Sequence, residues 1–142
     1  MSGHGKVEIP LDYLIQTHVL MNASYEKMKE LLGESVALAF FSMAADMGPL
    51  SKAEGYESVD ALRSMLTEAG YDLTGSQHGD TVTFRLKCPH SDKIHPLMGE
   101  GASFCPMSQL VLAAIRAKYR QSVLIKSELE RGGSTFTIEA RE

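Results

Sequence analysis

The sequence predicts an α+β fold in which N-terminal helices pack on a four-stranded antiparallel sheet. Between residues 11 and 69, apolar positions recur every three or four residues, which is the period of an α-helix. Residues 71–88 and 122–141 instead alternate apolar and polar side chains around a glycine-containing turn, which is typical of a β-hairpin. A helical pattern lies between the two hairpins, so the predicted order of the second half is β-β-α-β-β.

The first helix is predicted over residues 11–32. Pro10 suits the first turn of a helix and Gly33 suits its end. The apolar stripe of this helix also contains His18 and Asn22. A single histidine on such a stripe is more often a core residue than a metal ligand, so His18 is predicted to be part of the core.

Two further helices are predicted over residues 34–47 and 58–69. The second helix is apolar on nearly every side and ends at Gly48-Pro49. Such a helix is buried on most sides, either at the centre of the domain or against a second copy of the chain. The third helix has its apolar residues on one face and is predicted to end at Gly70.

The first hairpin is predicted to have strands at residues 71–74 and 81–88, joined by a turn at 75–80. Side chains of a strand point alternately to its two faces. One face of the second strand is therefore formed by Val82, Phe84, Leu86 and Cys88. Cys88 is thus expected to close the apolar face of this strand.

Residues 89–104 show no periodicity and contain two prolines and two glycines, so we expect an irregular loop. A loop of this length inside a compact domain usually has a function. Pro106 suits the first position of a fourth helix that runs to about residue 119, which would make Cys105 its N-cap.

The second hairpin is predicted to have strands at residues 122–130 and 134–141, joined by a turn at Arg131-Gly132-Gly133. Alternation predicts which side chains share the inner face of this hairpin. They are Val123, Ile125 and Leu129 on the first strand, and Phe136, Ile138 and Ala140 on the second.

The length of 142 residues predicts one domain, with a helical front at 1–70 and the sheet, loop and fourth helix at 71–142. Eighteen acidic residues against fourteen basic ones, without a basic run, argue against a nucleic-acid-binding protein. No stretch has the length of a membrane span, and the N-terminus has no signal-peptide core, so a cytoplasmic protein is expected. In that compartment cysteines are reduced, bound to metal or reactive.

The two cysteines of the chain lie at the ends of the predicted loop, and two histidines lie within it. Two thiols and two imidazoles form a complete tetrahedral ligand set for a metal ion, and zinc suits this mixed set best. A bound metal would also offset the entropy of closing the loop. The predicted metal ligands are Cys88, His90, His95 and Cys105.

Two other cofactors fit short motifs in the same segment. Cys88-Pro89-His90 resembles the first half of a Rieske motif, which would bind an iron–sulfur cluster. The Cys-Pro dipeptide occurs twice and resembles the heme-responsive motif of some regulators. An iron–sulfur or heme redox sensor is therefore an alternative to the zinc protein.

A second alternative is a cysteine-dependent hydrolase or transferase. A cysteine at a helix N-terminus has a lowered thiol pKa and can act as a nucleophile. Cys105 would then attack the substrate, and His90 or His95 would act as the base. A third interpretation assigns no chemistry to these residues: Cys88 and Cys105 are buried, and the two histidines are solvated.

The last third of the chain combines a cysteine at a helix start, a strand ending in Glu128, the turn Gly132-Gly133 and Phe136-x-Ile138. Over residues 80–141 this resembles the C-terminal half of the 4-vinyl reductase-type domain, which is similar to archaeal output domains and thiazoline carboxylate hydrolases. The resemblance implies a small ligand-binding α+β module that is often dimeric. It also implies a small-molecule pocket between the helical front and the sheet.

The sequence therefore favours a small cytosolic metal-binding domain with a regulatory or sensor function over an enzyme. Its expected partners are a metal ion, a small-molecule ligand, and either a second copy of the chain or a regulatory protein.

Overall fold

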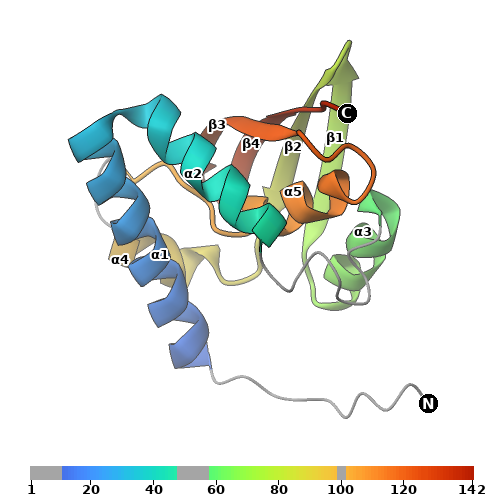
Figure 1. Ribbon diagram of the computed structural model, residues 1–142. Helices are drawn as coiled ribbons and strands as arrows, with labels where there is room; N and C mark the ends of the chain where they lie inside the picture. Colours follow the sequence, from blue (N-terminus) through green and yellow to red (C-terminus); the bar gives the residue numbers. More distant parts are fainter. Residues whose placement is uncertain (1–10, 48–57, 99–101) are drawn as a thin grey trace.

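The computed structural model describes residues 11–47, 58–98 and 102–142 (Figure 1). The predicted helix-flanking residues Pro10 and Gly48-Pro49 lie outside these ranges. The described part contains five helices and four strands, and it confirms the predicted α+β fold. The elements are α1 Leu11–Leu32, α2 Glu34–Met47, α3 Val59–Glu68, β1 Asp72–His78, β2 Thr81–Lys87, α4 Ser91–Met98, α5 Ser108–Arg116, β3 Val123–Glu130 and β4 Gly133–Glu139.

The four strands form one antiparallel sheet in the order β1-β2-β4-β3, so β2 and β4 are the central strands. Phe84 of β2 pairs with Phe136 of β4, and the centroids of their stacked rings are 5.6 Å apart. The neighbouring residues Thr83 and Thr137 point to the opposite face, where their hydroxyl groups form a hydrogen bond of 3.1 Å. The sheet therefore has one apolar and one polar face, as the alternation predicts.

The helices form layers on the apolar face of the sheet. Helix α5 and part of α2 lie against β3, α3 lies against β1, and α1 packs on α2 and α4 (Figure 1). Val111 and Leu112 of α5 are fully buried between the sheet and the outer helices. The N-terminal helices thus pack on the sheet as predicted, with α1 in the layer farthest from the strands.

An aromatic cluster joins α1 and α2 to the segment that precedes α5. The ring of Phe104 stacks on Tyr25 at a centroid distance of 4.6 Å and contacts Phe41 at 4.8 Å. Asn22 of α1 donates a hydrogen bond of 3.1 Å from its side-chain amide to the carbonyl oxygen of Phe104. This cluster fixes α1 beside the chain that leads to Cys105.

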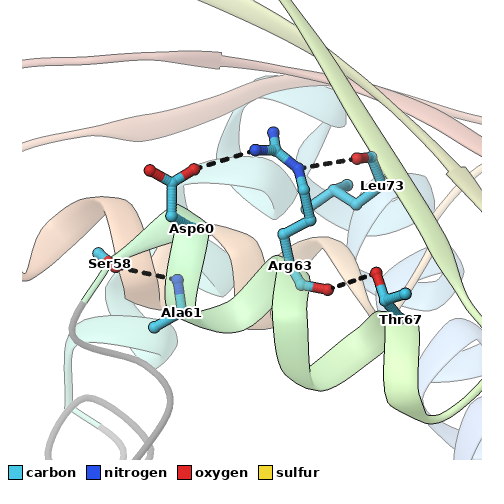
Figure 2. A network of polar contacts seen from close by, with 6 residues as sticks. All are labelled: Ser58, Asp60, Ala61, Arg63, Thr67 and Leu73. Carbon is cyan, nitrogen blue, oxygen red and sulfur yellow. Dashed lines mark hydrogen bonds and ion pairs between the residues drawn. The ribbon is translucent and has the colours of Figure 1, made fainter.

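Polar contacts fix α3 to the edge strand β1 (Figure 2). Arg63 donates from Nε to the carbonyl oxygen of Leu73 at 3.0 Å, and its Nη1 contacts the carboxylate of Asp60 at 3.0 Å. The Ser58 hydroxyl accepts a hydrogen bond of 3.0 Å from the backbone N–H of Ala61, which caps the helix.

The prediction of an irregular loop at residues 89–104 is wrong in the first half of this segment, where the chain forms helix α4. The backbone N–H groups of Lys93 and Ile94 donate to the carbonyl oxygen of His90 at 3.0 and 3.1 Å and start this helix. Pro96 inside the helix has no N–H to donate, so the sequence signal for a helix is weak there. Burial of Ile94, which is 1% exposed, holds the short helix against the core.

The second hairpin pairs as predicted, but the inner face of β3 differs from the prediction. The register shifts between Leu124 and Lys126, so Ile125 is a bulge residue and is exposed. Leu124 is buried instead, and its N–H donates to the Ser42 hydroxyl of α2 at 3.0 Å. Strict alternation failed here because a bulge inserts one residue and reverses the faces.

Over residues 34–43, helix α2 is buried on one side only. Val36, Phe40 and Met43 are 47%, 53% and 60% exposed, whereas Ala37, Leu38 and Phe41 are buried. The expectation that one chain buries this helix on most sides is therefore wrong, and the homodimer stays a prediction. In the described part of the chain, no helix combines the length and apolarity needed to cross a membrane.

Candidate functional site

The two cysteines lie at the ends of two structured segments that meet. Cys88 follows β2, and its N–H donates to the carbonyl oxygen of Gly132 in the β3–β4 turn at 2.8 Å. Cys105 precedes α5, and its N–H donates to the hydroxyl of Ser127 on β3 at 3.1 Å. Neither cysteine is in a disulfide bond, and Cys88 is half-buried whereas Cys105 is buried. The second hairpin thus positions the backbone of both cysteines.

Both cysteines line one small cavity. Its free volume is about 10 Å³, close to the space of a single water molecule. His95 of α4 and His18 of α1 line the same cavity. The other described lining residues are Leu86, Ile94, Met98, Pro106, Met107, Leu129, Gly133 and Ser134.

The structure brings together three of the four predicted metal ligands. Cys88, His95 and Cys105 share the cavity wall, whereas His90 is not part of it. The carbonyl group of His90 instead starts helix α4. His18 is the residue that the sequence analysis assigned to the core. It is buried as predicted, but it faces the same cavity as the two cysteines.

Helices α1 and α4 pack against one another, and this contact brings the two histidines to the cavity. Burial lowers the pKa of His95, and the nearby imidazole of His18 lowers it further. A neutral imidazole is the form that binds a metal ion, so this environment favours the ligating form of His95.

Cys105 does not cap helix α5 as predicted, because the helix begins at Ser108 after a preceding turn. The backbone N–H of Ser108 donates to the Cys105 carbonyl oxygen at 3.0 Å, and the Ser108 hydroxyl donates to the same atom at 2.6 Å. Burial raises the pKa of the Cys105 thiol, although the neighbouring Ser134 hydroxyl and the backbone of Met107 and Ser108 oppose the increase. The resting thiol is therefore protonated.

Tyr71 is a further polar neighbour of the thiols that the sequence analysis did not identify. Burial raises the pKa of its hydroxyl group, and the Cys88 thiol, which forms a hydrogen bond with Tyr71, raises it further. Tyr71 is half-buried beside the core, directly after α3. No local pattern indicated this residue, because its contact with Cys88 depends on the pairing of β1 with β2.

These residues provide the atoms for metal binding but not a preformed coordination shell. Within residues 11–47, 58–98 and 102–142, no group of three or more His, Cys, Asp or Glu side chains has the geometry to hold an ion. Two cysteines and two histidines nevertheless line the same small cavity. Binding would therefore require these side chains to rearrange.

Comparison with known proteins gives no relative: the chain matches no protein-family model, no curated protein and no solved structure. The resemblance of residues 80–141 to the 4-vinyl reductase-type domain therefore stays a prediction.

Proposed function

We propose that this protein is a metal-binding regulatory module that binds one zinc ion in the cavity between α1, α4 and the second hairpin. One observation carries the proposal: Cys88, Cys105, His95 and His18 border the same enclosed space of about 10 Å³. The proposed ligand set keeps three of the sequence-predicted residues and has His18 in place of His90.

The chemistry of this set suits zinc. Zinc binds thiolates and neutral imidazoles in tetrahedral geometry, and it has no redox chemistry that would oxidise adjacent thiols. The lowered pKa of His95 supports its role, because the imidazole is available without losing a proton. The Cys105 thiol must lose its proton, and the positive charge of the metal supplies the driving force for that step.

A zinc ion with four protein ligands has no open position for a substrate. The expected consequence of binding is therefore mechanical. The ion would connect α1, the end of β2, helix α4 and the turn before α5. Metal occupancy would then control how firmly the outer helix α1 is held on the rest of the fold, which is the basis of the proposed regulatory role.

The alternative cofactors and the enzyme are supported less well. A heme or an iron–sulfur cluster needs far more space than a cavity of about 10 Å³ provides. A nucleophilic cysteine needs access to substrate and a lowered pKa, whereas Cys105 is 7% exposed and burial raises its pKa. Zinc binding requires neither an exposed thiol nor a large cavity.

The test is elemental analysis and an absorption spectrum of protein purified without oxygen. We expect about one zinc per chain and no visible absorption band. Cys105→Ser, His95→Gln and His18→Gln should each lose most of the metal. His90→Gln is the matched control and should retain it, because His90 does not line the cavity.

Each other result has a defined meaning. Loss of zinc in His90→Gln, with retention in His18→Gln, would restore the ligand set predicted from sequence and contradict the role of His18. If the purified protein contained iron and had a visible absorption band, the site would be a redox centre and the zinc proposal would be contradicted. Absence of any metal, also after incubation with Zn²⁺ and dialysis, would overturn the proposal.

A further inference from the structure

A second and much larger cavity lies between α3, α5 and the β1–β2 hairpin. Its volume is about 530 Å³, which is within the range of small-molecule sites. None of its described lining residues belongs to the wall of the cysteine–histidine cavity. The two cavities are therefore separate sites, and this inference does not depend on zinc binding.

Apolar side chains form the body of this cavity. Val82 and Phe84 come from β2, Ile115 from α5 and Val59 from the start of α3. Gly75 of β1 lies opposite Phe84, and a Cβ atom at this position would be only 3.1 Å from the Phe84 ring. Glycine therefore lets the ring lie flat against the edge strand and adds no side chain to the cavity.

The positive charges at the cavity differ in their contacts. Arg63 is already bound to the Asp60 carboxylate and the Leu73 carbonyl group (Figure 2). Lys118 lies after α5, with its Nζ atom 5.4 Å from the centroid of the Tyr119 ring. No carboxylate forms an ion pair with Lys118 among the described residues.

An acidic side chain limits how much negative charge the site can accept. Asp80 lines the same cavity from the turn between β1 and β2. Of the two cations among the described lining residues, Arg63 has an acidic partner and Lys118 has none within the described ranges, so this part of the cavity offers one available positive charge beside the negative charge of Asp80. This balance suits a ligand with a single negative charge and disfavours polyanions such as nucleoside triphosphates, whose charges Asp80 would repel.

We propose that this cavity binds a small apolar molecule with one carboxylate group, such as an aromatic or medium-chain carboxylic acid. The apolar body contacts Val82, Phe84 and Ile115, and the carboxylate contacts the ammonium group of Lys118. Burial of the apolar body supplies most of the affinity, and the ion pair at the rim supplies selectivity for the anion.

The test uses two probes of nearly equal shape, 2-naphthoate and its uncharged amide 2-naphthamide. Each is titrated into the ¹⁵N-labelled full chain, and amide shifts give both the location and the dissociation constant. We expect shifts centred on β2 and α5, and binding of 2-naphthoate that is about threefold to fivefold tighter, as one exposed ion pair allows.

Two charge variants separate the proposed contact from general electrostatics. Lys118→Met should bind both probes with equal affinity, and the fold should be retained because Lys118 is exposed. Lys126→Met is the matched control, since Lys126 is an exposed lysine on β3 that pairs with Glu128 and does not line the cavity. Its preference for 2-naphthoate should be unchanged.

A third variant tests the apolar part of the site. Val82→Phe narrows the cavity and should lower the affinity for both probes by a similar factor. The proposal is overturned if both probes bind the unmodified chain equally well, if Lys118→Met keeps the preference, or if the shifts fall on the exposed face of α2. Loss of zinc from the other cavity would leave all of these results unchanged.

Discussion

At the scale of single residues, two adjacent glycines where the β3–β4 turn meets β4 are required for different reasons. Gly132 has a φ angle of +88°, and a Cβ atom there would have nothing within 4 Å. Gly133 is restricted by its neighbours instead, because a Cβ atom added there would overlap the backbone carbonyl group of Leu86 on β2. The first glycine is needed for conformation, and the second for close approach of β4 to β2.

This difference predicts unequal effects of alanine at the two positions. Gly132→Ala should lower the free energy of unfolding by about 1–2 kcal/mol, the usual cost of a left-handed backbone for a residue with a Cβ atom. Gly133→Ala should cost more, roughly 3 kcal/mol or above, because the backbone of a central strand must move. Urea unfolding of both variants measures this. Equal decreases in the free energy of unfolding would show that the backbone of β2 moves aside at little cost, which would contradict the prediction.

A second residue-scale prediction concerns Tyr25, which is 1% exposed. Burial, with Glu34 and Glu26 nearby, raises its pKa to about 12. The unfolded chain loses the tyrosine proton near pH 10 and the folded chain near pH 12, so stability falls as pH rises through this window. Between pH 9 and pH 11, the free energy of unfolding of Tyr25→Phe should therefore fall by about 1 kcal/mol less than that of the unmodified chain. If the urea unfolding midpoints of the two chains fell equally between pH 9 and pH 11, this prediction would be contradicted.

At the scale of helices and strands, the strength of the local signal decided what the sequence could predict. Helices α1 and α2 have the predicted bounds because their periodicity is long and Gly33 separates them. Helix α4 has eight residues and an internal proline, so tertiary packing determines it. Strand β1 extends to His78 through polar residues without alternation, because pairing with β2 replaces the missing pattern.

The candidate site divides in the same way. The sequence indicated that Cys88 and Cys105 meet, since both flank one segment between a strand and a helix. It could not indicate that His18 joins them, because this histidine is seventy positions away from Cys88 and reaches the cavity only through the packing of α1 on α4. Site residues that are brought together by helix–helix packing cannot be recognised from the spacing of residues within one segment of the sequence.

A prediction at this scale tests the cap of α3. Ser58→Ala removes the hydroxyl group that accepts from the Ala61 N–H, so it should lower the free energy of unfolding by about 1 kcal/mol. Ser24→Ala is the matched control on the exposed surface of α1, where the serine hydroxyl only bonds to the Leu20 carbonyl oxygen within the helix. That variant should be neutral or slightly more stable. Calorimetric unfolding of the two variants decides the point.

At the scale of the whole molecule, the layers differ in how strongly the rest of the fold holds them. Strands β2 and β4 have a neighbour on each side, and α5 contributes fully buried residues beneath α2 and α3. Helix α1 is the outer layer, with Tyr13, Leu20 and Leu31 exposed. The contacts that hold it on the fold include the aromatic cluster, the Asn22 hydrogen bond and the His18 side chain at the cysteine–histidine cavity.

Amide hydrogen exchange should therefore separate these layers and respond to metal. Without zinc, we expect the slowest exchange in β2, β4 and α5, and faster exchange in α1, because outer elements with fewer buried contacts open more easily. Zinc should slow exchange in α1 around His18 more than in the edge strand β1, since the proposed ion connects α1 to the end of β2 and no described residue of β1 lines its cavity. In His18→Gln this selective slowing of α1 should disappear while the exchange of β4 is unchanged. An equal effect of zinc on every element would indicate general stabilisation, and it would contradict the idea that the metal acts by holding the outer helix.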